Sequence, residues 1–234
     1  MPSILDEIVA KKRDELAASV ASTPMAALRD MISRRPTALD FPGALRKDGI
    51  SLIAESSPDS HFLGEPAHLT AVKESGASAD LPVLRKDFIF DEYQVYEARA
   101  IGADTYLLIV DILSAAQLSE LIALGKSLGM TPLVETHDAD EIATAADAGA
   151  EVIGINNRNL HTFVTDLATT EQLARFIPAG KVIVSESGIS TPDDLARLEP
   201  FQVDAVLVGE ALVTAEDTGA KVRALSGVAL PTGR

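Results

Sequence analysis

From Ile50 onward, the chain alternates short apolar segments with longer helical segments rich in alanine and leucine. The apolar segments span residues 50–54, 82–84, 105–110, 132–134, 152–155, 182–184 and 205–208. Because these segments show no alternation of polar and apolar residues, we expect them to be buried on both faces, as in a parallel sheet. Strict alternation of such strands with helices predicts an α/β fold.

Polar residues directly follow most of the predicted strands. They are Glu55, Arg85, Lys86, Glu135, Asn156, Ser185, Glu186, Gly209 and Glu210. In an open doubly wound sheet the ligand lies at one switch point, so only two or three strand ends would carry such residues. In a TIM-type barrel all strand ends surround one mouth. The pattern therefore predicts a TIM-type (β/α) barrel, of which seven of the eight βα units are recognisable.

The chain is predicted to be a single domain over residues 1–234. Residues 1–49 form a helical N-terminal extension, since Leu5, Ile8, Val9 and Leu16 recur at helical spacing, and residues 50–234 form the barrel. Residues 56–81 contain one clear helix and no additional strand. The missing eighth unit therefore belongs to this stretch.

Composition excludes several classes of function. Lys and Arg number 20 against 35 Asp and Glu, which gives a net charge of −15. Such a surface repels phosphate backbones and anionic lipids, so we expect neither nucleic-acid nor membrane partners. The chain has no cysteine, which excludes disulfides and cysteine nucleophiles. No apolar run suits a membrane span or a signal peptide, so we expect a soluble, cytoplasmic protein.

The four histidines give no sign of a metal site. They are His61, His68, His137 and His161. Their positions do not match the spacings typical of metal ligands. We therefore expect them to be surface residues and predict no metal.

Lys86 lies just past a predicted strand, in the segment Pro-Val-Leu-Arg-Lys-Asp-Phe of residues 82–88. A lysine in a barrel mouth can protonate a developing oxyanion or form a Schiff base. The same position also suits a solvated loop lysine paired with Asp87. Both interpretations stay open at this point.

Glu55, Glu135 and Glu186 each follow a predicted strand directly or almost directly. Three carboxylates around one mouth, with a lysine among them, shift one another's pKa values and can supply both an acid and a base. Acidic residues at strand ends also cap the helices that follow. Capping is the alternative for each glutamate taken singly.

Two kinds of residue suggest that the mouth binds an anion. Asn156 is suited to hydrogen bonding, and Arg158 either to a forked contact with phosphate or to a surface salt bridge. The turns after the last two strands contain Ser187, Gly188, Gly209 and Glu210. In TIM-type barrels, backbone amides of these two turns commonly bind phosphate. Nearby Phe88, Leu107 and Leu160 are typical of barrel layers and are also candidate substrate contacts.

Together, these motifs resemble those of the indole-3-glycerol-phosphate synthase family, the ring-closing enzymes of tryptophan biosynthesis. The matching segments are 82–89, 91–99, 107–110, 133–135, 154–160, 185–189 and 206–209. The resemblance implies a carboxy-lyase that converts 1-(2-carboxyphenylamino)-1-deoxyribulose 5-phosphate into indole-3-glycerol phosphate, carbon dioxide and water. It implies no cofactor, because the iminium formed on cyclisation takes up the electrons released with carbon dioxide.

The resemblance also implies roles for single residues. Lys86 would be the general acid of ring closure, Glu135 would handle the proton of the later dehydration, and Glu55 would assist. Asn156, Glu186 and Ser187 would orient the carboxylate and hydroxyls of the substrate. Arg158 and the amides near Gly188, Gly209 and Glu210 would bind its phosphate.

The segment after Glu55 departs from the family pattern. The family has a lysine two residues after this glutamate, where the chain has Ser57. About 30 residues, the length of one βα unit, are also missing. The loss of a strand exposes two sheet edges, which an irregular barrel or a second copy of the chain could cover. The alternative function is a degenerate barrel or interaction subunit of the same family, which binds a phosphosugar or a partner without catalysis.

Overall fold

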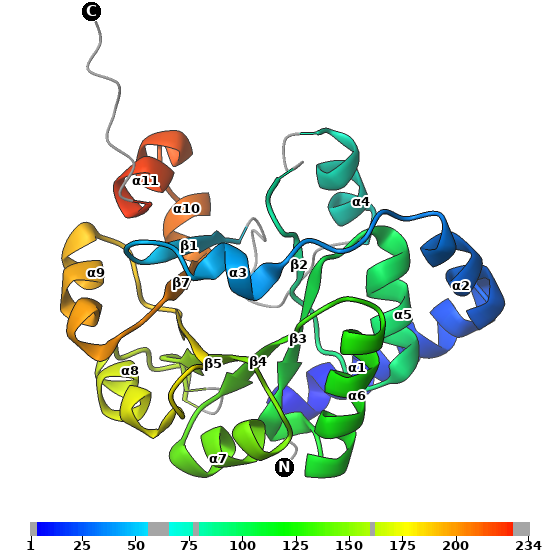
Figure 1. The fold of residues 1–234 in the computed structure, drawn as a ribbon, viewed down its shortest axis with the longest axis horizontal. Helices are drawn as coiled ribbons and strands as arrows, with labels where there is room; N and C mark the ends of the chain where they lie inside the picture. Colours follow the sequence, from blue (N-terminus) through cyan, green and yellow to red (C-terminus); the bar gives the residue numbers. More distant parts are fainter. Residues whose placement is uncertain (1–3, 56–65, 77–79, 160–161, 227–234) are drawn as a thin grey trace, which may run out of the picture.

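Seven parallel strands form one curled sheet with helices along its outer side (Figure 1). The computed structural model describes residues 4–55, 66–76, 80–159 and 162–226. The strands are β1 (Ser51–Ala54), β2 (Leu84–Arg85), β3 (Thr105–Ile109), β4 (Leu133–Thr136), β5 (Val152–Asn156), β6 (Val182–Glu186) and β7 (Ala205–Val208). Their order is β1-β7-β6-β5-β4-β3-β2, and no ladder joins β1 to β2 among the described residues. The predicted TIM-type α/β architecture is confirmed, as a curled half-barrel.

The helices that lie between the strands and after β7 cover the outer face of the sheet. They are α4 (Pro66–Glu74), α5 (Glu92–Ile101), α6 (Ala115–Ser127), α7 (Ala139–Asp147), α8 (Ala168–Leu173), α9 (Pro192–Leu198), α10 (Glu210–Val213) and α11 (Thr218–Leu225), with the 3₁₀ helices η1 (Val110–Ile112), η2 (Ala174–Phe176) and η3 (Glu199–Phe201). The larger apolar core lies between these helices and the sheet and includes Tyr106, Leu108 and Ile153. The buried hydroxyl of Tyr106 donates a hydrogen bond of 2.7 Å to the carbonyl of Leu121 on α6, which ties helix to sheet.

The inner face of the sheet is apolar along most of the strands and polar at their carboxyl ends. Leu133, Val152, Val182 and Ala205 pack together inside the curl, with Phe41 of α3 (Phe41–Leu45) in the same cluster. Because side chains alternate along a strand, residues two or four positions further on face the same side. Glu135, Gly154, Asn156, Val184, Glu186 and Leu207 are the residues at those positions. The fold therefore directs both strand-end glutamates into the half-barrel.

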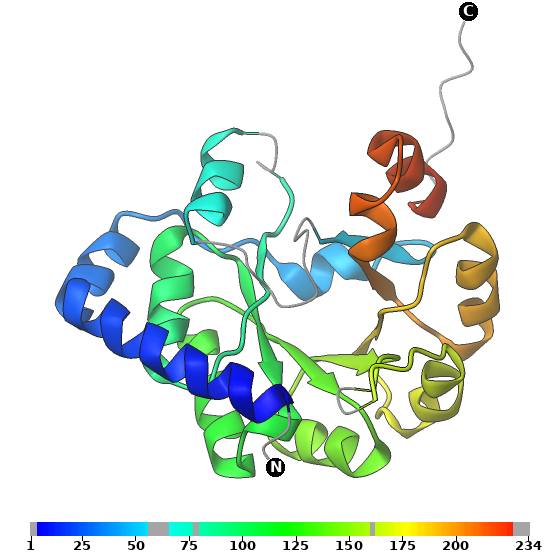
Figure 2. The same cartoon turned by 180° about the vertical axis from the view of Figure 1, so that it is seen from behind.

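The predicted N-terminal extension is helical. It contains α1 (Ile4–Ser22) and α2 (Met25–Ser33), which lie beside α5 in both views (Figures 1 and 2). The hydroxyl of Tyr93 on α5 donates to the carbonyls of Ser19 and Thr23, at 2.9 and 2.8 Å. The extension is thus anchored on the side of the barrel that carries β2. The division into 1–49 and 50–234 within one domain stays a prediction.

The strand boundaries differ from the sequence prediction at the functional end. The apolar runs predict that strands end at residues 134, 155 and 184, whereas β4, β5 and β6 continue through Thr136, Asn156 and Glu186. A polar side chain ends an apolar run but not a strand where the carboxyl end of the barrel interior is itself polar. The helices α3 and α10 are not predicted by the sequence pattern. Residues 56–65, where the family pattern is shortened, lie outside the described residues.

Candidate active site

Lys86, Glu135 and Glu186 meet inside the half-barrel at the carboxyl ends of the strands. The Lys86 ammonium nitrogen lies 3.8 Å from Glu135 Oε2 and 3.7 Å from Glu186 Oε2. The side chains of both glutamates are 1% exposed and that of Lys86 is 12% exposed. This burial contradicts the interpretation of Lys86 as a solvated loop residue. The sequence prediction that these three residues converge on one mouth agrees with the geometry.

The protonation state of Lys86 follows from its neighbours. Burial acts to lower the pKa of Lys86, but the charges of Glu135, Glu186 and Glu55 outweigh burial and raise this pKa above its ordinary value. Lys86 is therefore an ammonium ion at neutral pH. A Schiff base requires the neutral amine, so this environment favours proton donation.

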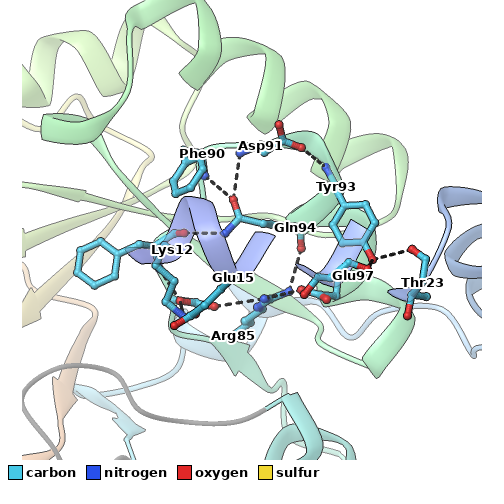
Figure 3. A network of polar contacts seen from close by, with 12 residues as sticks. Lys12, Glu15, Thr23, Arg85, Phe90, Asp91, Tyr93, Gln94 and Glu97 are labelled. Carbon is cyan, nitrogen blue, oxygen red and sulfur yellow. Dashed lines mark hydrogen bonds and ion pairs between the residues drawn. The ribbon is translucent and has the colours of Figure 1, made fainter. Parts of the chain in front are cut away.

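The residues on either side of Lys86 are fixed by a polar network, shown in Figure 3. The Arg85 guanidinium contacts Glu97 at 2.7 Å and Asp87 at 3.2 Å, and it donates to the carbonyl of Gln94 at 3.1 Å. Asp87 also pairs with Lys12 of α1, at 2.9 Å. These contacts hold the strand end that presents Lys86, and they give Asp87 partners other than Lys86.

Glu135 is held as a carboxylate. Asn156 Nδ2 donates a hydrogen bond of 3.0 Å to Glu135 Oε1, and Asn156 Oδ1 accepts from the backbone N–H of Arg158 at 3.0 Å. Burial acts to raise the pKa of Glu135, but contacts with His137, Lys86 and Asn156 outweigh it and lower the pKa to about 2. At neutral pH Glu135 is therefore a base.

Glu186 occupies the opposite state. Burial, followed by the negative charge of Glu135, raises the pKa of Glu186 to about 8. Both of its oxygens are buried and lack a hydrogen-bond partner among the described residues. The carboxyl group fits because residue 154 is glycine, since a Cβ atom there would collide with Glu186 Oε1. At neutral pH Glu186 keeps its proton and can donate a hydrogen bond.

His137 belongs to the site although the sequence predicts a surface residue, and this prediction is wrong. Its side chain is 17% exposed and lies between two carboxylates, with Nε2 3.3 Å from Glu135 Oε1 and Nδ1 3.1 Å from Glu141 Oε2. These contacts, in spite of burial, raise the pKa of His137 to about 10. The sequence signal that could find it is the position of His137 directly before the N-cap Asp138 of α7, with Glu141 in the first turn of that helix. His68 is exposed, whereas His61 and His161 lie outside the described residues.

Glu55 directly follows β1 and lies near Lys86 at the edge of the site. Its backbone N–H donates to the carbonyl of Val208 at 2.8 Å, which continues the ladder between β1 and β7. Its carboxylate lies against Gly209, where a Cβ atom would come within 2.8 Å of Glu55 Oε2. Burial raises the pKa of Glu55, and Lys86 and Arg158 oppose this shift.

The candidate phosphate-binding residues gather near β6 and β7. Arg158 pairs with Glu210 at 3.1 Å, and the side chain of Glu210 is 80% exposed. Ser187 and Gly188 both have positive φ angles, 68° and 79°, which turn the chain sharply after β6. Gly209 is the residue before α10. This salt bridge is one of the two roles that the sequence allows for Arg158. The side chain of Arg158 stays partly exposed at the mouth.

The remaining predictions from the sequence concern three apolar residues, Phe88, Leu107 and Leu160, and metal binding. Phe88 and Leu107 are buried in the inner cluster, as barrel layers are. Leu160 lies outside the described residues. Within the described parts of the chain no group of three potential metal ligands is present.

Comparison with known proteins adds independent information. The family profile for indole-3-glycerol phosphate synthase matches residues 50–225. The enzyme of that name from Dehalococcoides mccartyi is 49% identical over 187 residues, which cover 80% of this chain and 72% of the relative. The one from Roseiflexus sp. is 42% identical over 267 residues, covering 97% of this chain and 99% of the relative. The chain belongs to the indole-3-glycerol-phosphate synthase family. Its function is therefore that of a carboxy-lyase of tryptophan biosynthesis.

Solved structures of lower identity show the fold alone. The 3-hexulose-6-phosphate synthase from Salmonella typhimurium superposes with a TM-score of 0.64 at 18% identity, over 76% of this chain and 85% of that chain. The 3-keto-L-gulonate-6-phosphate decarboxylase from Vibrio cholerae gives a TM-score of 0.58 at 14% identity, over 76% and 85% of the two chains. Among the described residues, no helix has the length and apolar character of a membrane span.

Proposed function

We propose that Lys86, Glu135 and Glu186 carry out the ring closure, decarboxylation and dehydration of 1-(2-carboxyphenylamino)-1-deoxyribulose 5-phosphate. The observation that supports this most is the position of one buried ammonium ion between two buried carboxyl groups of opposite protonation state. Such a cluster holds an acid and a base on one face of a bound substrate.

Ring closure begins with Lys86 as the general acid. The ring carbon that bears the carboxylate attacks the ketone carbon, a carbon–carbon bond forms, and Lys86 protonates the developing alkoxide. The aromatic amine then carries a positive charge as an iminium. Carbon dioxide leaves, and the electron pair of the broken bond neutralises the iminium.

Dehydration uses the base of the cluster. The new hydroxyl leaves as water after a second proton transfer from the cluster, and Glu135 accepts the proton lost from the carbon next to nitrogen. Glu186, which is neutral, donates a hydrogen bond to the substrate without repelling its carboxylate. Asn156 and Ser187 orient the carboxylate and hydroxyls, and Glu55 assists from β1.

Binding of the substrate divides between polar and apolar groups. The phosphate is assigned to Arg158 and to backbone amides near Gly188, Gly209 and Glu210. For that, Arg158 exchanges its exposed partner Glu210 for the phosphate, at little cost because exposed salt bridges contribute little stability. Phe88, Leu107 and Leu160 are assigned to the aromatic part of the substrate.

The test is an assay for indole-3-glycerol phosphate by indole fluorescence, with native protein and Lys86→Met compared. We expect product from the native chain and a loss of kcat of about 10²–10⁴-fold in the variant, the typical contribution of general acid catalysis. A stable substrate analogue should bind both proteins within a few-fold. Equal activity of the two proteins would contradict the assignment of Lys86.

The degenerate-barrel alternative predicts a different result. The alignment with the Roseiflexus relative spans 267 residues, more than the 234 of this chain, so it contains gaps in this chain. If the shortened region carries an indispensable residue, the native chain binds the analogue but forms no product. Size-exclusion chromatography with light scattering, run on the same sample, tests whether the chain forms homo-oligomers.

A further inference from the structure

His137 is a largely buried titratable residue that contacts the cluster and has no role in the proposed mechanism. It follows β4 directly, so it lies beside the strand end that presents Glu135. Its Nε2 faces Glu135 Oε1 at 3.3 Å inside the half-barrel, and its Nδ1 faces Glu141 Oε2 at 3.1 Å toward α7. The ring therefore connects a catalytic carboxylate with a carboxylate outside the cluster.

Glu141 holds the histidine at two points. Its Oε2 accepts from the backbone N–H of His137 at 2.7 Å and contacts the ring nitrogen of the same residue. Glu141 itself is fixed because Asp138 caps α7 and accepts from the backbone N–H of Glu141 at 2.8 Å. The position of the imidazole is thus set by the start of α7 rather than by the substrate.

We infer that His137, held by Glu141, is a positioning residue that keeps Glu135 ionised and turned toward Lys86. With Asn156 and His137 both on Oε1, the other oxygen of Glu135 is the one that faces Lys86. The inference rests on the proposed role of Glu135 as the base. Glu135 and Glu186 lie on the same inner face of the sheet, yet they differ in protonation. The inference explains this difference, since among the described residues His137 contacts Glu135 and not Glu186.

The charges around the ring support a protonated imidazole. Glu135 on β4 and Glu141 on α7 contact it directly, Lys86 lies beyond Glu135, and the charge of the ring acts on Glu186 without a contact between them. Asp111 on η1, which packs against β4 and α7, is exposed. Two anions in contact and a cation further off favour the imidazolium.

The direct test is an NMR titration of the histidine ring protons in the native protein and in Glu141→Gln. The signal of His137 is assigned by its loss in His137→Gln. We expect a native midpoint near pH 10 and a fall of at least about one unit in Glu141→Gln, because one contacting anion is lost. The control Glu120→Gln removes the same charge from an exposed site on α6 and should leave the midpoint unchanged.

The pH profile of kcat distinguishes a positioning role of His137 from a purely structural one. In His137→Gln we expect kcat to fall about tenfold while KM stays within about twofold of the native value. The midpoint of the acid limb of the kcat profile should rise by at least about one pH unit, because the pKa of Glu135 rises when the positive charge of His137 is lost. If that variant does not fold, Glu141→Gln should show the same changes in weaker form. A native midpoint near 6.5, or profiles in both variants that superpose on the native one, would overturn the inference. If the native chain forms no product, the proposed function fails, and the NMR titration still decides whether the pair holds a charged histidine.

Discussion

The ends of β4 and β6 present the same residue type on the same face, yet in opposite states. Glu135 and Glu186 are equally buried and nearly equidistant from Lys86. Glu135 Oε1 accepts a hydrogen bond from Asn156 and lies 3.3 Å from His137 Nε2, an ion-pair contact, whereas neither oxygen of Glu186 has a hydrogen-bond partner among the described residues and one of them lies against Gly154. The strand position decides where a carboxyl group points, and the contacts from the next strand and loop decide whether it is charged.

The largest expected effect comes from removing the charged member of the pair. Glu135→Gln keeps the shape of the side chain but cannot accept a proton. We expect kcat to fall about 10²–10⁴-fold, as for loss of a general base. Steady-state fluorescence assays measure this, and a fall of less than about tenfold would mean that Glu135 is not the base.

Gly154→Ala tests the space that Glu186 needs. A Cβ atom at residue 154 would overlap the Glu186 carboxyl group, so the side chain must move. We expect a loss of about 1–3 kcal/mol in the free energy of unfolding, typical of overpacking, together with a lower kcat. Urea unfolding measures the first quantity. As a control, Ala143→Gly at an exposed site on α7 should cost about 1 kcal/mol through helix propensity and leave kcat unchanged.

The pH dependence of stability tests both unusual pKa values together. Glu186 and His137 have higher pKa values in the folded state than in the unfolded state, so the stability they contribute is complete at low pH and is lost as pH rises through about 8 and 10. The lowered pKa of Glu135 acts only below about pH 5. One pKa unit corresponds to about 1.4 kcal/mol, so we expect the free energy of unfolding to fall by on the order of 5 kcal/mol between pH 5 and 9. A flat or rising curve from urea titrations would contradict this.

The smallest effect is expected for Glu186→Gln at neutral pH. The native group is already neutral, and an amide can also donate a hydrogen bond. We therefore expect kcat to fall by less than about tenfold, against a much larger fall in Glu135→Gln. The alkaline limb of the native profile, near pH 8, should disappear in the variant. Equal losses in the two variants would show that the two carboxyl groups are not distinguished.

The sequence predicts the architecture and the convergence of Lys86, Glu135 and Glu186 because both depend on local pattern. Apolar runs mark strands that are buried on both faces, and the polar residues next to them mark the functional end. The charges of Glu135 and Glu186 could not be predicted, since they depend on Gly154 and His137, which come from other positions along the chain. His137 is missed because a histidine after a strand is usually exposed, and only the start of α7 turns it inward.

The protonation states of the two buried glutamates, a base at Glu135 and an acid at Glu186, can be measured directly. Infrared or carbon-13 NMR titration of carboxyl-labelled glutamate in the native protein resolves the individual protonation steps. We predict one carboxyl group that titrates near pH 8 and is absent in Glu186→Gln, and one that stays ionised to about pH 2 and is absent in Glu135→Gln. If both groups titrate together near pH 4–5, the ordinary range for glutamate, the site does not separate Glu135 and Glu186 into a base and an acid.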